Sequence, residues 1–140
     1  MDWNAYLDAW NRHDGAGVAS FFTDDGVFTD HALGRRHQGR DSIAGFVESA
    51  AEEVSSDYEL ALLDTFQAGD RYALVWTFGG TNDRSNPDPP LPATGKQFSV
   101  RGVSIGRLKG DRITENTDYW NLAEFLAQLG LMPAPAGTSG

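Results

Sequence analysis

Apolar residues recur at helical spacing in the first third of the chain and at strand spacing in the remainder. Four of them lie at the intervals i, i+3, i+4 and i+7, on one face of a helix expected over residues 3–12. Asp2 precedes this segment and is a candidate N-cap. The chain is therefore predicted to begin with an amphipathic helix. Its apolar face consists of Trp3, Tyr6, Leu7 and Trp10.

Two further helices and one strand are predicted next. Asp14 is a candidate N-cap for a second, short helix, and Asp41 for a third. Between them, the Asp-Asp-Gly sequence at 24–26 predicts a turn, and residues 27–32 predict a strand. Residues 33–39 form a basic loop in this interpretation.

The remainder of the chain has the composition and alternation of strands. A polar loop at 82–94 holds four of the six prolines and is long enough to form a lid or a pocket rim. A short helix is expected at 122–129. The strands are expected over residues 58–67, 72–81, 97–108 and 112–121.

The order of these elements predicts an α+β fold, because helices come first and a meander of long strands follows. We expect a cone-shaped, curved mixed or antiparallel β-sheet with the N-terminal helices packed on its concave side. Residues 1–132 are expected to form a single domain, since no internal repeat is evident. Residues 133–140 have the composition of a disordered tail.

The composition excludes several classes of partner. Eleven Lys and Arg against twenty Asp and Glu leave a net charge of −9, which argues against nucleic acid and anionic membrane surfaces. No apolar run is long enough to span a bilayer, and the N-terminus lacks the pattern of a signal peptide. The chain has no cysteine, so disulfides and a thiol nucleophile are excluded and a cytoplasmic location is expected.

The strand expected over residues 112–121 carries the most distinctive polar pattern. Alternation would place Asn116 and Asp118 on one face, together with Thr114 and Trp120. If this face lines a cavity, Asp118 is a candidate general acid or base, because burial raises the pKa of a carboxyl group. Asn116 could then orient a substrate carbonyl or a water molecule. The alternative for Asp118 is a structural carboxylate that accepts hydrogen bonds from a neighbouring strand or loop.

Asp30 and His31 lie near the end of the first strand. Adjacent strand residues point to opposite faces, so only one of the two would face a cavity. Asp30 is a second candidate base, with a cap or turn acceptor as its alternative role, and His31 is otherwise a surface residue. The three histidines form no metal-binding motif, so no metal is expected.

Small residues alternate along the strand expected over residues 97–108. Gly102, Ser104 and Gly106 share one face, where they either allow close packing or leave room for a ligand. The same stretch matches the Gly-x-Ser-x-Gly pattern of serine hydrolases. No helix follows it, so we interpret the match as chance.

Aromatic residues are numerous enough to form both a core and a pocket wall, with four Trp and eight Phe. Trp10, Trp76 and Trp120 could belong to either, and Phe78 shares a strand face with Trp76. A wall of such residues would bind an apolar ligand.

Four segments resemble the nuclear transport factor 2-like superfamily and, within it, the SnoaL-like group of polyketide cyclases and small isomerases. They are YLDAWNRHDGAGVASFFTDDGVFTD, GRDSIAGF, TGKQFSVRGVSIGRLKGDRITENTDYW and NLAEFLAQLGL, which together cover most of the chain. The resemblance implies a cone-shaped sheet with a pocket, commonly a homodimer and usually no cofactor. It does not fix the activity, because this superfamily hosts several chemistries.

Individual members of the superfamily suggest roles for single residues. Tyr6 and Asp30 match a tyrosine and the base aspartate of ketosteroid isomerase, while Ser104 stands where that enzyme has a protonated aspartate. Asp118, within TDYW, matches an aspartate of limonene epoxide hydrolase, whose partner Arg-x-Asp has no counterpart in the neighbouring strands. It also matches the acid/base aspartate with which SnoaL-like cyclases close a ring by an intramolecular aldol step.

The resemblance implies a small cofactor-independent enzyme acting on an apolar, carbonyl-bearing molecule such as a polyketide, terpenoid or steroid-like compound. Asp118 would move a proton next to the carbonyl, Asn116 and Tyr6 would hold the enolate oxygen, and Asp30 would be a second base. The alternatives are a non-catalytic binding module, a structural dimerisation domain, or a hydrolase or dehydratase on the same scaffold. Candidate substrate-contacting residues are Trp10, Trp76, Phe78, Ser104, Trp120 and His31.

Overall fold

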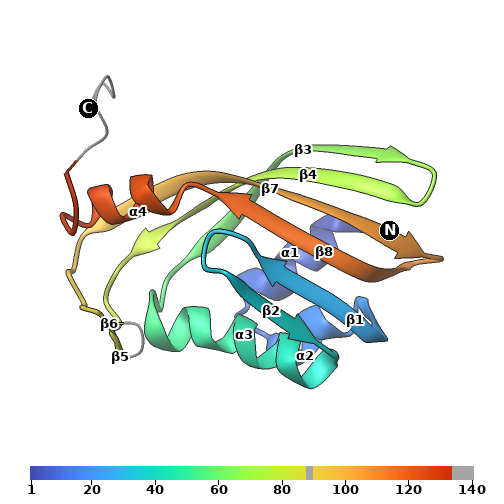
Figure 1. Ribbon diagram of the computed structural model, residues 1–140, viewed down its shortest axis with the longest axis horizontal. Coiled ribbons are helices and arrows are strands. Elements are labelled where there is room, and N and C mark those ends of the chain that lie inside the picture. Colours follow the sequence, from blue (N-terminus) through green and yellow to red (C-terminus); the bar gives the residue numbers. More distant parts are fainter. Residues whose placement is uncertain (88–89, 134–140) are drawn as a thin grey trace.

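The computed structural model describes residues 1–87 and 90–133, and its main element is a curved six-stranded sheet in the order β2-β1-β8-β7-β4-β3 (Figure 1). Only the β1–β8 pair is parallel among the pairs of this sheet, so the sheet is mixed. The strands are β1 (Phe22–Asp30), β2 (Arg35–Gln38), β3 (Glu59–Ala68), β4 (Arg71–Thr81), β7 (Gln97–Lys109) and β8 (Arg112–Trp120).

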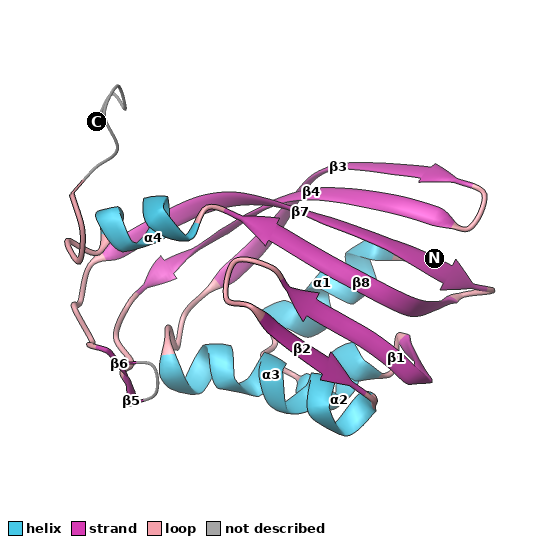
Figure 2. Ribbon diagram, viewed as in Figure 1, coloured by secondary structure: helices cyan, strands magenta, loops and turns pink. Residues whose placement is uncertain are grey.

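Helices cover the concave side of this sheet (Figure 2). Helices α1 (Trp3–Asn11), α2 (Gly15–Ala19) and α3 (Arg40–Glu53) lie below it, and α4 (Leu122–Gln128) follows β8 and packs against β7. The predicted α+β fold with a curved sheet is thus confirmed. The expected tail begins at residue 133, and its residues 134–140 lie outside the described part of the chain.

The first two helices begin as predicted. The carboxylates of Asp2 and Asp14 each accept a hydrogen bond from the backbone amide three residues further on, at 3.0 and 2.9 Å. These bonds satisfy amide groups that a helix leaves unpaired in its first turn. All four apolar residues predicted on one face of α1 are buried. This helix therefore supplies part of the core beneath the sheet.

Three predicted boundaries between residues 22 and 41 are wrong. β1 begins at Phe22, and the predicted turn at 24–26 is an irregular stretch within it, where the register with β8 shifts. The predicted basic loop contains β2, an edge strand in which three of the four residues are exposed. The N-cap of α3 is Gly39, without a side-chain cap, while Asp41 lies in the first turn and complements the helix dipole.

A bulge in β8 changes the alternation predicted for that strand. The register between β7 and β8 shifts after Arg107, which leaves Thr114 as an extra residue. The hydroxyl of Thr114 donates to the carbonyl of Arg107 at 3.1 Å, so Thr114 does not join the inward face as predicted. Beyond the bulge the inward side chains are those predicted, namely Asn116, Asp118 and Trp120.

Two glycines of β7 make room for aromatic side chains of β4. Gly102 is the register partner of Trp76, and Gly106 is the register partner of Tyr72. A Cβ atom would lie 2.2 Å from Cη2 of Trp76 at the first position and 2.3 Å from Oη of Tyr72 at the second. The close-packing alternative is therefore correct at both glycines, and aromatic rings take the space that a ligand would need.

The loop predicted at 82–94 contains a short strand pair. β5 (Asn86–Pro87) pairs with β6 (Pro90–Leu91), and Leu91 packs against the cluster around α4. Asn86, Pro90 and Leu91 line a cavity, which agrees with the expected pocket rim.

Candidate active site

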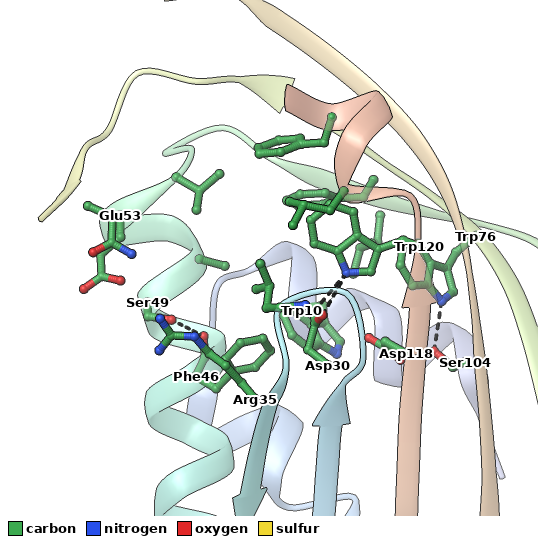
Figure 3. Close-up of a pocket in the computed structure, with 18 of the residues that line it drawn as sticks. Trp10, Asp30, Arg35, Phe46, Ser49, Glu53, Trp76, Ser104, Asp118 and Trp120 are labelled. Carbon is green, nitrogen blue, oxygen red and sulfur yellow. Dashed lines mark hydrogen bonds between the residues drawn. The ribbon is translucent and has the colours of Figure 1, made fainter. Parts of the chain in front are cut away.

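A cavity of about 470 Å³ lies between the concave side of the sheet and the helices. A cavity of this size with a mainly apolar lining and a few polar groups is typical of small-molecule sites. Figure 3 shows Asp30, Asp118 and Trp120 on the strands at one side of the cavity, with Ser49 and Glu53 of α3 opposite. The largest apolar groups in its wall are Trp10, Phe46, Trp76, Phe78, Trp120 and Phe125.

Four polar residues of the cavity form one row across the sheet. Arg35 of β2 is the register partner of Asp30 of β1, and Asp30 is the register partner of Asp118 of β8. Asp118 is in turn the register partner of Ser104 of β7. All four line the cavity. Because neighbouring strands lie about 4.8 Å apart, the row brings two carboxylates from distant segments side by side.

Asp118 is held through one of its two oxygens. Its Oδ1 accepts hydrogen bonds from Oγ of Ser104 at 2.5 Å and from Nδ2 of Asn116 at 2.9 Å. No residue in the described ranges donates a hydrogen bond to Oδ2. Burial and, to a smaller extent, the charge of Asp30 raise the pKa of Asp118 to about 7, against the opposing effect of the two hydrogen bonds. Both protonation states of Asp118 are therefore populated near neutral pH.

Asp30 has different surroundings. The indole Nε1 of Trp120 donates to both of its oxygens, at 3.1 and 3.0 Å, and the backbone amide of Leu33 donates to Oδ1 at 2.9 Å. Burial raises the pKa of Asp30, while these hydrogen bonds and the charge of Arg35 oppose the rise. Protein donors thus occupy both oxygens of Asp30, whereas one oxygen of Asp118 receives no hydrogen bond from the described residues.

The two residues that donate hydrogen bonds to Asp118 accept hydrogen bonds themselves, from two side chains of β4. The hydroxyl of Tyr72 donates to Oδ1 of Asn116 at 2.6 Å, and Nε1 of Trp76 donates to Oγ of Ser104 at 2.9 Å. Asn116 is 1% exposed and does not line the cavity. Its amide therefore faces Asp118 and Tyr72, rather than a substrate oxygen as the sequence suggested.

The other residues expected at the site divide into two groups. His31 is exposed, lies beside Tyr119 with the ring centres 5.1 Å apart, and does not line the cavity. Burial and the nearby charge of Asp118 raise the pKa of Tyr6 far above its ordinary value, so its phenol stays protonated. The expected residues that do line the cavity are Tyr6, Trp10, Trp76, Phe78, Ser104 and Trp120.

Some residues of the site were not found from the sequence. Phe46, Ser49 and Glu53 line the cavity from α3, and Tyr72 supports Asn116 from β4. From the sequence alone, Ile43, Phe46 and Val47 have the spacing of a helix face, which predicts a place in the core and does not point to a cavity. Tyr72 could have been found from the pairing of an aromatic residue with Gly106, but that pairing requires the register of the sheet.

Within residues 1–87 and 90–133, no group of three or more His, Asp and Glu side chains could hold a metal ion. In the same ranges, no helix has the length and hydropathy needed to cross a membrane.

Comparison with known proteins identifies relatives over most of the chain. The sequence model described as SnoaL-like domain matches residues 3–116. A protein of unassigned function with a ketosteroid isomerase-like fold from Catenulispora acidiphila, solved in complex with trimethylamine, has a TM-score of 0.80 and 25% identity over 99% of this chain and 96% of that one.

Two further solved structures have the same fold. TsrD from Streptomyces laurentii has a TM-score of 0.79 and 22% identity, over 93% of this chain and 92% of that one. A candidate polyketide cyclase from Xanthomonas campestris pv. campestris has a TM-score of 0.73 and 25% identity, over 91% of this chain and 93% of that one.

Proposed function

The chain belongs to the SnoaL-like domain family, and we propose that it is a cytoplasmic, cofactor-independent enzyme that moves a proton next to a carbonyl group of an apolar small molecule. The substrate class we favour is a polyketide, terpenoid or steroid-like compound. The observation that carries the proposal is Asp118, a carboxyl group with a pKa of about 7 whose Oδ2 is left for a ligand in an apolar cavity. A general acid or base is most effective when its pKa lies near the working pH.

The proposed reaction begins with the ionised form of Asp118. Its Oδ2 takes a proton from the carbon next to the carbonyl, and the electron pair of that C–H bond moves toward the carbonyl oxygen. The protonated phenol of Tyr6 donates to the enolate oxygen that develops, where a positioned donor has most effect. In a cyclisation, the enolate carbon attacks a second carbonyl carbon and closes a ring, and the alkoxide that forms takes the proton from Oδ2 of Asp118. In an isomerisation, another carbon of the enolate takes that proton and the double bond shifts. Asp118 ends in its ionised starting state in both reactions.

Asp30 is the weaker candidate for the base, because Trp120 and Leu33 already donate to its oxygens. We assign it an electrostatic role, since its charge favours the protonated form of Asp118.

Deuterium exchange tests the proposed reaction without knowledge of the natural substrate. The protein is incubated in deuterated buffer with β-tetralone and with an aromatic β-diketone, and deuterium uptake next to the carbonyl is followed by mass spectrometry. We expect exchange above the buffer rate, and a loss of roughly 10²- to 10⁴-fold in Asp118→Asn. The matched control is Asp111→Asn, which removes an exposed carboxylate from the turn between β7 and β8. Equal catalysed exchange in wild type and Asp118→Asn would contradict the assignment of Asp118 as the proton-transfer group.

A binding module without chemistry is the second candidate. The mainly apolar lining of the cavity supports it, and the relative from Catenulispora acidiphila was solved with a small molecule, trimethylamine. A bound compound that is recovered unchanged, with no exchange beside its carbonyl, would favour this candidate over the enzyme.

We also propose that the chain forms a homodimer through the outer face of the sheet. Phe66, Ile105 and Tyr119 are 57%, 42% and 44% exposed there. Phe66 and Ile105 both pair with Ala73 in one row, and Tyr119 lies in the next row. Light scattering after gel filtration should give twice the chain mass for wild type and the single mass for Ile105→Lys. A monomeric wild type at high concentration contradicts this assembly.

A further inference from the structure

Tyr72 of β4 reaches across β7 to a residue of β8. Tyr72, Gly106 and Asn116 are register partners on three consecutive strands. Any side chain at Gly106 would occupy the path of the Tyr72 hydroxyl, since a Cβ atom there would lie 2.3 Å from Oη. The glycine is therefore what allows a direct hydrogen bond between two strands that are not neighbours.

The hydrogen bond from Tyr72 to Asn116 is one side-chain bridge, and a second bridge joins Trp76 of β4 to Ser104 of the neighbouring strand β7. The ring of Trp76 lies over Gly102, its register partner on β7, and its Nε1 donates to Oγ of Ser104 at 2.9 Å. An indole N–H can only donate, so the hydroxyl of Ser104 accepts from Trp76 and directs its own proton to Asp118. Trp76 thereby fixes the direction of the bond from Ser104.

Tyr72 fixes the direction of the other bond. Its hydroxyl donates to the amide oxygen of Asn116, and the amide nitrogen is then the atom that faces Asp118. With the amide turned round, two oxygen acceptors would face each other across the gap to Oδ1. The two bridges therefore end in two donors on the same oxygen of Asp118 (Figure 3 shows the bond from Trp76 to Ser104).

We propose that Tyr72 and Trp76 are positioning residues that bind Oδ1 of Asp118 through Asn116 and Ser104 and so leave its proton on Oδ2. An oxygen that already accepts two hydrogen bonds is a poor place for a proton, and Oδ2 receives none from the described residues. The neutral form then donates from Oδ2 to a ligand oxygen, and the ionised form accepts a proton at the same atom. This inference deepens the proposed function and rests on Asp118 as the proton-transfer group.

The test is the titration of the Asp118 carboxyl carbon by ¹³C NMR in wild type and in Tyr72→Phe, with Asp118→Asn to assign the signal. The substitution removes one hydroxyl and keeps the ring. Without the hydroxyl the Asn116 amide is free to rotate, and the ionised form of Asp118 loses a donor that favours it. We expect the pKa of Asp118 to rise by about 0.5–1 unit relative to wild type.

Tyr58→Phe is the matched control. The hydroxyl of Tyr58 is also buried and donates to the backbone carbonyl of Trp10 at 3.0 Å, but it is not part of either bridge. Removing it should cost similar stability and move the pKa of Asp118 by less than about 0.2 unit. Trp76→Phe deletes the other donor and should also raise the pKa of Asp118. If Tyr72→Phe does not fold, Trp76→Phe provides the test of the positioning role.

An unchanged pKa of Asp118 in folded Tyr72→Phe or Trp76→Phe overturns the positioning role, as does an equal rise in Tyr58→Phe. The change in the pKa of Asp118 between wild type and each variant can be measured even if the pKa of Asp118 in wild type has its ordinary value. A failure of the proposed function and a failure of the positioning role are therefore distinguishable in one data set.

Discussion

Asp30 and Asp118 are register partners on the parallel strands β1 and β8, and both carboxyl groups line the same cavity. Trp120 donates to both oxygens of Asp30, whereas the donors to Asp118 all meet on Oδ1. Two carboxylates in one site disfavour double ionisation, and burial raises the pKa of both. We therefore propose that Asp118 is the group that gains and loses a proton, and that the charge of Asp30 beside it raises the pKa of Asp118.

Replacing Asp30 should make Asp118 a stronger acid. The charge of Asp30 raises the pKa of Asp118, so Asp30→Asn should lower it, by roughly 0.3–1 unit. The measurement is the same carboxyl-carbon titration, made at low ionic strength so that salt does not screen the pair. A pKa of Asp118 that stays the same or rises in Asp30→Asn would show that the two groups do not interact as like charges.

Asp118 should make the folded protein less stable at high pH. Its folded-state pKa of about 7 is raised above the unfolded value, so its contribution to stability is fully present below the unfolded pKa of about 3.9 and is lost as the pH rises through about 7. Because Asp118 lines the cavity and is only partly buried, we expect a loss of about 1–3 kcal/mol between about pH 5 and about pH 9.

The matched variant for this pH dependence is Asp118→Asn, which resembles the neutral acid and cannot ionise. The free energy of unfolding from urea titrations should fall with pH in wild type more than in the variant. The difference between the two proteins should change between about pH 4 and about pH 7 and stay constant above that range. Parallel stability curves across this range would exclude a raised pKa at Asp118.

Gly102→Ala should destabilise the fold, because the new Cβ atom would lie 2.2 Å from the ring of Trp76. Overpacking of this kind costs about 1–3 kcal/mol, which urea titration would detect. Trp76→Leu in the Gly102→Ala background should recover part of the loss by removing the clash.

The control for this substitution is Gly45→Ala on the exposed side of α3. A Cβ atom at Gly45 meets no heavy atom within 4 Å, and alanine favours a helix interior, so this variant should gain about 0.5–1 kcal/mol. A Gly102→Ala protein as stable as wild type would contradict the close packing of β4 on β7.

The local sequence predicts those parts of the fold in which neighbouring residues decide the structure. Asp2 and Asp14 cap the helices that directly follow them in the sequence. The alternation of more and less buried residues in β4 and β7 can likewise be predicted without knowing the partner strands. By contrast, β2 (Arg35–Gln38) has no apolar alternation and forms because β1 offers an edge to pair with. The sequence predicts Thr114 as an ordinary strand residue, and only the register with β7 shows that it is the extra residue of a bulge.

In the candidate site too, the features set by neighbouring residues could be predicted and those set by distant strand pairing could not. Asp118 was found from its place on a strand next to Asn116 and Trp120. The sequence suggests a substrate as the hydrogen-bond partner of Asn116. Its partner in the structure is Tyr72, which lies 44 residues away in the sequence and cannot be inferred from a local pattern. The pairing of Asp30 with Asp118 also depends on the parallel register of two strands that no local pattern specifies.

The most direct test of the account is the pH titration of the Asp118 carboxyl carbon by ¹³C NMR in the wild-type protein. We expect a midpoint at a pH of about 7, which would establish a desolvated carboxyl group able to give and take a proton at neutral pH. A midpoint near the ordinary value of about 3.9 would contradict the account, because Asp118 would then be fully ionised at neutral pH and unable to serve as an acid.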